Sequence, residues 1–449
     1  MNHANLRLHF ETLAMNYQLF DQIKDLDFPA PLPEKLLVVK QRFDVPRVAD
    51  IEASTRAAVR ELMLGARPGA TVAIGAGSRG IANIARIARA AVDVLKADGF
   101  HPYIFPAMGS HGGATMEGQC TMIREFGITA ETMGCELRAT MVVREIGHIE
   151  GGPKLYQGED SLSADHVILL SRIKPHTDFR GMLESGPSKM AVIGLGKQAG
   201  AAIMHSYGGP GFTRYLADAA RVYESNTNFI GAVGIIENAY DETAEIMAVP
   251  ANKVGTDVES EALKRARSYM ASIPFTHVDT LVIQAIGKNI SGTGMDTNII
   301  NRLMVVREPE PTSGPDVATI SVLDLTPETH GNASGIGMAN STTERVARKY
   351  DFIATYTNGL TSGTFGAFRS SLPIVATTDQ RAIQYAIRGC GQPWETARLM
   401  FIRNTLAMDE FWTSPSLRTE IEGHERLSIV GETPLTFMNG LMTCPWQLK

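Results

Sequence analysis

The sequence predicts an α/β protein built from two lobes with mostly parallel sheets. Short apolar runs alternate with glycine-containing loops and amphipathic stretches, a pattern typical of parallel strands joined by crossover helices. Of the 449 residues, 42 are glycine and 44% are hydrophobic, which is typical of a well-buried globular protein. A chain of this length exceeds the usual size of one hydrophobic core, so two domains are expected.

The first predicted domain spans residues 1–272. Its strands are expected at 34–43, 71–74, 101–106, 166–170 and 229–236, and its helices at 50–65, 81–97, 115–125, 211–224 and 257–270. Two β-like runs within 136–157 suggest an antiparallel flap.

The second predicted domain spans residues 273–449, after a connection at 273–277. Strands are expected at 278–286 and 319–325, and helices near 341–350 and 377–388. The last fifty residues give no clear domain and are expected to pack back on either lobe. An active-site cleft is expected between the two domains.

Composition and charge exclude several classes of function. The formal net charge is −6 and no run of basic residues occurs, which argues against nucleic acid or an anionic membrane as a partner. No stretch of eighteen apolar residues or secretory signal pattern occurs, so a cytoplasmic location is expected. The four cysteines lack metal-binding spacing and are expected to be free or buried thiols.

The most informative stretch runs from residue 171 to residue 205, directly after the apolar strand 166–170. In open α/β sheets, ligands bind beyond the carboxyl ends of the strands, so chemistry is expected here. The stretch contains His176 after a proline, Lys189 after small residues and His205 after an Ala/Gly-rich segment. Lys189 suits a tether or nucleophile, or else a surface lysine, and His205 suits a metal ligand or a helix cap.

Three further candidates follow other predicted strands. Arg79 lies in the loop GAGSRG at a helix start, where it could hold a carboxylate or phosphate or remain solvated. His111 lies in GSHGG, a setting that favours a catalytic or ligand histidine. Lys288, in GKN, follows the first strand of the second domain.

The same GAGSRG loop has the spacing of a dinucleotide-binding turn, with Gly75, Gly77 and Gly80. The acidic residue that usually ends the next strand is missing, because that strand runs into Phe105-Pro-Ala-Met-Gly-Ser. A tight turn beside a ligand is therefore the favoured use of the glycines. A nicotinamide dinucleotide site remains an alternative.

Together these positions resemble the nickel-dependent lactate racemase family, whose enzymes carry a nickel-pincer nucleotide. The resemblance covers most of the chain and is most specific from Arg79 to His205. Arg79 matches an arginine that the family has in the loop after an early strand. Gly109-Ser-His111 matches its Gly-Thr-His motif, and Pro175-His176 matches its Pro-His motif. Gly186-Pro-Ser-Lys189 matches the Gly-Gly-Ala-Lys of the family, and His205 matches the histidine that follows sixteen residues later. Lys288 matches the lysine of its Pro-Lys-Asp motif.

The resemblance implies an isomerase, a racemase or epimerase of a 2-hydroxy acid. It implies that Lys189 carries a pyridinium-3-thioamide-5-thiocarboxylic acid mononucleotide with nickel, and that His205 is the protein ligand of the metal. It also implies that His111 and His176 exchange protons with the substrate hydroxyl while hydride moves transiently to the tethered cofactor. Arg79 would bind the carboxylate and Lys288 would stabilise the substrate oxygen.

The chain departs from the family pattern near the substrate. The Asp-x-Thr-Arg loop reads Gly77-Ser-Arg-Gly80, and the segment between His176 and Lys189 is longer than in lactate racemases. A larger 2-hydroxy acid, such as a sugar acid, is therefore expected. Asp178, Arg180 and Glu184 could contact its extra hydroxyls or form a solvated turn.

The expected partners are this small-molecule substrate and cofactor maturation enzymes, and the oligomeric state is open. Two rival functions also remain open. The first is an NAD-dependent 2-hydroxy acid dehydrogenase, and the second is a non-catalytic binding protein for the cofactor or a sugar acid.

Overall fold

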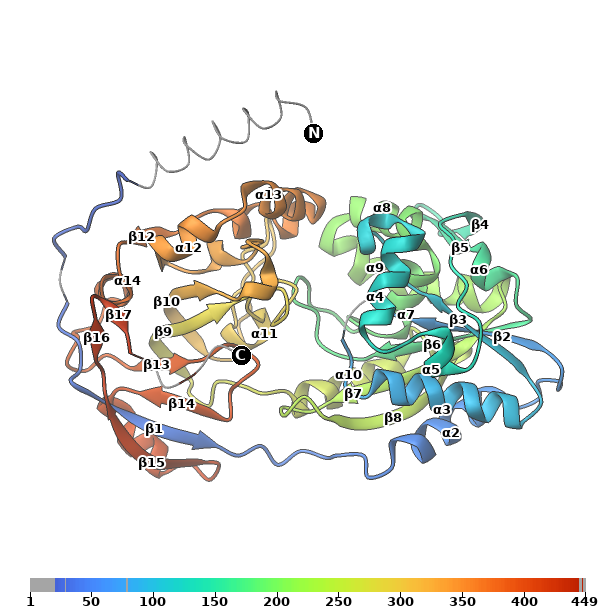
Figure 1. The fold of residues 1–449 in the computed structure, drawn as a ribbon, viewed down its shortest axis with the longest axis horizontal. Helices are drawn as coiled ribbons and strands as arrows, with labels where there is room; N and C mark the ends of the chain where they lie inside the picture. The colour runs from blue at the N-terminus through green and yellow to red at the C-terminus, as the bar shows by residue number, and fades with distance from the viewer. Residues whose placement is uncertain (1–20, 29, 78–79, 444–445, 447–449) are drawn as a thin grey trace. The chain divides into compact units, whose positions relative to one another are not determined.

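The computed structural model describes residues 21–28, 30–77, 80–443 and 446. The chain forms two compact units (Figure 1). The central unit is Asp44–Met270, and the terminal unit combines Met1–Phe43 with Ala271–Lys449. The division after Met270 lies close to the predicted connection at 273–277. The first 43 residues, however, belong to the terminal unit rather than to the predicted domain 1–272.

The central unit contains a five-stranded sheet in the order β3-β2-β6-β7-β8. Its strands are β2 (Thr71–Ala76), β3 (His101–Pro106), β6 (His166–Arg172), β7 (Phe229–Glu237) and β8 (Thr243–Pro250). The first four strands in the order are parallel, and β8 is antiparallel to β7. The crossovers between parallel strands carry the helices, as their apolar periodicity predicts.

The helices of the central unit cover the buried sheet. They are α2 (Ile51–Leu62), α3 (Ile84–Ala97), α4 (Met116–Glu125), α5 (Ala130–Met133), α6 (Glu159–Leu162), α7 (Pro187–Met190), α8 (Lys197–Ser206), α9 (Gly208–Asn226) and α10 (Asp257–Tyr269). Three short turns are η1 (Gly112–Ala114), the π-helical η2 (Ala191–Leu195) and η3 (Ala251–Lys253).

One hydrophobic core of the central unit lies between α2, α3 and one face of the sheet. Alternate residues of β2 and β6, such as Ile74 and Ile168, are fully buried in this core with Val59 and Ile87 from the two helices. Both strands are buried along nearly their whole length, as their continuous apolar runs predict, and each helix buries one apolar stripe. The hairpin of β4 (Val143–His148) and β5 (Lys154–Gly158) is antiparallel, which confirms the predicted flap.

The terminal unit contains an eight-stranded sheet in the order β12-β11-β10-β9-β13-β14-β1-β15. These strands are β1 (Lys35–Gln41), β9 (His277–Ile286), β10 (Asp316–Leu325), β11 (Ser341–Thr343), β12 (Ile374–Ala376), β13 (Leu399–Ile402), β14 (Glu410–Thr413) and β15 (Leu427–Pro434). The half from β12 to β13 is parallel, whereas β14, β1 and β15 pair antiparallel.

Helices and turns complete the terminal unit. They are α11 (Thr297–Ile300), α12 (Glu344–Lys349), α13 (Phe352–Thr361), α14 (Asp379–Gly389), α15 (Arg418–Glu422), η4 (Pro327–Thr329), η5 (Ile336–Met338), η6 (Gly363–Phe365), η7 (Phe368–Ser370) and η8 (Pro415–Leu417), with the small hairpin β16 (Phe437–Met438) and β17 (Leu441–Met442). A core beneath α14 includes Trp412, whose ring stacks on Trp446 at 4.3 Å between centroids.

These features confirm the α/β fold class with large, mostly parallel sheets. Within the described part of the chain, every helix is too short or too polar to cross a membrane. Cys120, Cys135 and Cys390 are free thiols, as predicted.

Candidate functional site

Three loops of the central unit leave the same edge of its sheet. They follow Ala76 of β2, Pro106 of β3 and Arg172 of β6, and these strands are parallel neighbours in register. Ligands of open α/β sheets bind at this edge. The loops after β3 and β6 carry His111 and His176, so the structure brings both histidines to the edge where the sequence predicts a site.

Two buried phenylalanines connect three of the predicted site residues. The rings of Phe179 and Phe212 stack with centroids 5.1 Å apart. The His176 ring stacks on Phe179 at 4.4 Å, and the His205 ring lies 5.1 Å from Phe212 in a tilted arrangement. Nζ of Lys189 lies 5.9 Å from the centroid of the same Phe212 ring. Both imidazoles and the amine therefore border one continuous aromatic surface.

The loop that carries His176 is closed on itself and held by a buried carboxylate. Lys174 and Ser185 exchange backbone hydrogen bonds at its base. The Glu184 side chain, which is fully buried, accepts hydrogen bonds from the backbone N–H of His176 at 2.6 Å and of Gly181 at 3.0 Å. Glu184 thus stabilises the loop from inside. It neither faces a substrate hydroxyl nor lies in a solvated turn, the two roles that the sequence suggested.

The hydrogen bonds of the His176 ring indicate its tautomer. Nδ1 of His176 accepts the backbone N–H of Asp178 at 3.0 Å, and one carboxylate oxygen of Asp178 lies 3.8 Å from the same nitrogen. Because Nδ1 uses its lone pair as an acceptor, the proton of the neutral ring lies on Nε2. The side chain is 14% exposed, so the ring is largely enclosed.

The turn that carries Lys189 is anchored by a buried glutamate. Pro187 occupies the first turn of α7, where its fixed φ suits a helix start. Ser188 is fully buried and donates from its backbone N–H at 3.1 Å and its hydroxyl at 2.9 Å to Oε1 of Glu259 on α10. Lys189 itself is half-buried. Ser188 therefore bonds into the protein interior, whereas the amine of Lys189 lies beside the Phe212 ring.

His205 lies in the last turn of α8. Although the residue is exposed along the helix, its ring lies against Phe212, and this loss of hydration lowers the pKa of His205 below its usual value. The positive charge of Lys189 lowers this pKa further, whereas the carboxylate of Asp178 raises it. His205 is thus within electrostatic reach of both side chains and favours the neutral form that ligates metals.

The loop that carries His111 is tied to the protein by Gln119 of α4. The fully buried Gln119 donates from Nε2 to the carbonyl oxygen of Gly109 at 3.0 Å and of Met108 at 3.3 Å. A Cβ at Gly109 would lie 2.8 Å from Cβ of Ala201, so the loop packs directly on α8. Ala201 precedes His205 by about one helical turn. The half-buried His111 therefore follows a segment in contact with the helix of His205.

Arg79 lies outside the described residues, and its predicted role toward a carboxylate stays a prediction. The entrance to its loop is described: a Cβ at Gly77 would lie 3.4 Å from Cε of Met190, the residue after Lys189. Gly75 lies within β2 itself, and a Cβ there would be only 2.5 Å from Leu169 on β6. Close strand packing therefore explains this glycine without a dinucleotide.

The predicted second-domain residue, Lys288, belongs to the terminal unit. It follows β9, and its Nζ donates to the carbonyl oxygen of Gly292 at 2.6 Å. Its backbone N–H donates to the hydroxyl of Thr329 at 3.2 Å. The side chain is thus partly engaged within its own glycine-rich loop. Its predicted role toward the substrate oxygen stays a prediction.

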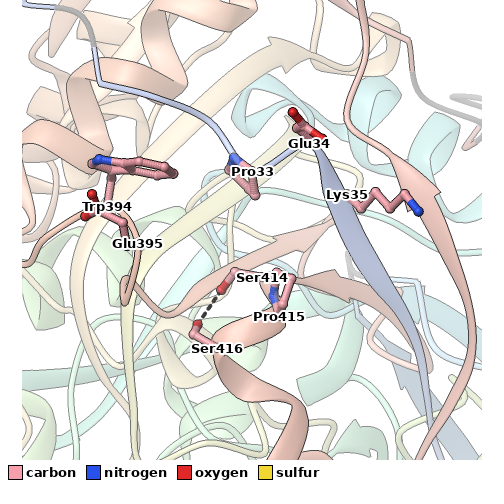
Figure 2. Close-up of a pocket in the computed structure, with 8 residues that line it drawn as sticks. All are labelled: Pro33, Glu34, Lys35, Trp394, Glu395, Ser414, Pro415 and Ser416. Atoms are coloured by element: carbon pink, nitrogen blue, oxygen red, sulfur yellow. Dashed lines mark hydrogen bonds between the residues drawn. The ribbon is translucent and has the colours of Figure 1, made fainter.

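The terminal unit also has an open surface pocket (Figure 2). It is lined by Pro33, Glu34, Lys35, Trp394, Glu395, Ser414, Pro415 and Ser416. The hydroxyls of Ser414 and Ser416 are 2.7 Å apart, and each lies 2.9 Å from the carbonyl oxygen of Ala397. The Trp394 side chain borders the opening. None of the predicted site residues that the structure describes lines this pocket.

Sequence reasoning missed several residues that shape the site. Phe212 has the helical spacing of an ordinary core residue, and Glu259 lies in the charged helix α10. No motif distinguishes either residue. The burial of Glu259 in an otherwise amphipathic helix becomes evident only once the turn at Ser188 is seen packed against it.

In the described part of the chain, no three His, Cys, Asp or Glu side chains are grouped so that they could hold a metal ion. The chain matches no protein-family model, and no curated protein matches it.

Proposed function

We propose that the protein is a racemase or epimerase of a 2-hydroxy acid that uses a nickel-pincer nucleotide attached to Lys189. The observation that supports this most is the shared contact of the Lys189 amine and the His205 imidazole with Phe212, with His176 on the adjoining ring. A tethered cofactor needs its anchoring amine and its metal ligand on the same surface. These two side chains meet that requirement.

The donor set of the central unit suits such a cofactor. A nickel ion held by two sulfurs and one carbon of the nucleotide needs a single protein ligand, and imidazole is a suitable one. His205 would supply that ligand and Lys189 the covalent attachment. The bound group would accept the hydrogen of the substrate α-carbon as hydride and return it. Cofactor maturation enzymes in the cytoplasm would load it.

The remaining residues would orient the substrate and handle its hydroxyl proton. His176 is held in position by Glu184 and Phe179, and its neutral ring carries the proton on Nε2, because Nδ1 accepts the N–H of Asp178. That proton suits a hydrogen bond to the hydroxyl or oxo oxygen of the substrate. His111, on the loop against α8, would be the second imidazole needed for the opposite face. Arg79 would bind the carboxylate.

Two polar side chains of the His176 loop support a substrate larger than lactate. The Asp178 side chain is 20% exposed beside the His176 ring, and Arg180 is half-buried and donates to the carbonyl oxygen of His176. Hydroxyls of a sugar acid would find both acceptors and donors there. Glu184 is excluded from this role because its carboxylate is buried and already bonded.

Mass spectrometry of the intact protein tests the proposal. Protein co-expressed with the maturation enzymes should carry an adduct on Lys189 and interconvert the two configurations of a 2-hydroxy acid without consuming added NAD. Lys189→Ala should lose both the adduct and the activity. Lys264→Ala, which removes an exposed lysine of α10, should keep both. Active protein with an unmodified Lys189 would refute the cofactor assignment.

A further inference from the structure

We infer that helix α10, which carries none of the predicted site residues, positions both Lys189 and His176. Two of its side chains bind the two segments that bear them: Glu259 holds the Lys189 turn, and Arg267 holds Glu184 beneath the His176 loop. The geometric part of the inference concerns the folded chain alone. Its catalytic consequence rests on the proposed function.

The first anchor is the Glu259 carboxylate, a residue only 2% exposed. Oε1 accepts both bonds from Ser188, and Oε2 accepts the backbone N–H of Gly255 at 2.8 Å. A Cβ at Gly186 would lie 2.4 Å from Oε1, so the chain before the lysine passes directly over the carboxylate. All three partners are donors, which suits a carboxylate acceptor. Burial raises the pKa of Glu259, and the hydrogen bonds from Gly255 and Ser188 oppose this effect.

The second anchor acts through one intermediate residue. The guanidinium of Arg267 pairs with the carboxylate of Glu184, and Glu184 in turn binds the backbone N–H groups of His176 and Gly181. Burial raises the pKa of Glu184, and the charge of Arg267 opposes this effect. Arg267 therefore favours the charged state in which Glu184 can accept both backbone bonds.

The two anchors lie on the same side of one rigid element. Glu259 and Arg267 are separated by eight residues, which is about two turns of an α-helix. The same helix also carries Glu261 and Lys264, an exposed pair with 2.6 Å between Nζ and Oε1. Because the helix is stiff, it sets the separation of the lysine turn and the histidine loop, as supporting residues do around catalytic groups.

The test uses variants of each anchor, Glu259 and Arg267, and a control at the exposed Lys264 of the same helix, all in the full chain. Glu259→Gln keeps the size of the side chain but turns one acceptor into a donor. Arg267→Met removes the charge, Arg267→Lys restores it, and Lys264→Met is the control. Two measurements need no cofactor: the rate of Lys189 acetylation by acetic anhydride, followed by peptide mass spectrometry, and the nitrogen NMR signals of the His176 ring.

We expect a crossed pattern. Glu259→Gln should change the Lys189 acetylation rate several-fold and leave the His176 signals in place, whereas Arg267→Met should shift the His176 signals and leave the Lys189 rate within about twofold. In loaded enzyme, each should lower kcat by about 10- to 100-fold with a much smaller change in KM, as loss of a supporting residue does. Arg267→Lys should recover part of the loss, and Lys264→Met should match the wild type.

If Glu259→Gln does not fold, Glu259→Asp can replace it. Aspartate keeps the charge, but its shorter side chain moves the carboxylate oxygens away from Ser188, so the acetylation rate of Lys189 should change in the same way. Unchanged labelling in a folded Glu259 variant, or equal effects of Arg267→Met and Lys264→Met on the His176 ring, would overturn the inference. Because these readouts use cofactor-free protein, the crossed pattern without any racemase activity would instead count against the proposed function alone.

Discussion

Lys189 and Lys197 lie eight residues apart on either side of the π-helical turn, yet their surroundings differ completely. The Lys197 side chain is fully buried, and its Nζ donates to Asp160 at 2.7 Å and to the carbonyl oxygen of Pro106 at 2.6 Å. Lys189 is half-buried beside Phe212. Lys197 therefore ties the start of α8 to the end of β3, whereas the amine of Lys189 lies beside the Phe212 ring, where we propose the cofactor is attached.

The surroundings of each amine indicate the role of its lysine. Burial lowers the pKa of Lys197, and the Asp160 carboxylate opposes that effect. The backbone of Lys197 has φ +53°, a left-handed conformation that non-glycine residues seldom adopt. The buried ion pair and the left-handed backbone both support a structural role for Lys197. The following predictions test this contrast.

The largest effect is expected for Lys197→Met. Removal of one partner leaves Asp160 buried with an uncompensated charge, which costs about 3–5 kcal/mol of stability. Lys189→Met should cost less than about 1 kcal/mol, because the Lys189 side chain is only half-buried. Calorimetric unfolding of the central-unit transition measures both values. The double variant Lys197→Met/Asp160→Asn should recover part of the stability lost in Lys197→Met. Equal destabilisation by Lys197→Met and Lys189→Met would contradict the proposed difference between the two lysines.

A smaller effect is expected for Gly158→Ala, which narrows the space around the same pair. A Cβ at Gly158 would lie 2.6 Å from Oδ1 of Asp160 and 2.8 Å from Cε of Lys197. Overpacking of this kind typically costs about 1–3 kcal/mol. Gly431→Ala is a suitable control, since nothing lies within 4 Å of a Cβ there. A melting temperature of Gly158→Ala equal to that of the control would show that the pair tolerates displacement.

The smallest effect concerns the charge of Lys189 as felt by His205. Because the lysine cation disfavours protonation of the imidazole, Lys189→Gln should raise the pKa of His205. Asp178→Asn should have the opposite effect, because that carboxylate favours the protonated ring. NMR titration of the His205 ring in cofactor-free protein measures both. A decrease in Lys189→Gln would contradict the placement of the amine near this histidine.

Much of the fold could be predicted from the sequence. The strand HPYIFP is β3 from His101 to Pro106, because a compact apolar run between turn residues has few alternatives. The positions of His111 and His176 after parallel strands follow from the same pattern, since ligand loops gather at one edge of such sheets.

The interior of the site could not be predicted. Glu184 has the sequence setting of a solvated turn, and its burial depends on Arg267, which lies far along the chain. The Phe179–Phe212 stack joins a loop to a helix that no local pattern pairs. Likewise, the period of β1 predicts a strand but carries no information about its partners, β14 and β15. Long-range packing decides all three.

The pairing of β1 has a consequence for the order in which the protein can fold during synthesis. Leu37 pairs with Thr413 on one side and with Glu432 on the other, so β1 cannot complete its pairing until residue 432 has left the ribosome. The central unit is continuous from Asp44 to Met270 and needs no later segment for its sheet. Nascent chains should therefore present a folded lysine-bearing unit first, while β1 remains unpaired until β14 and β15 have been synthesised.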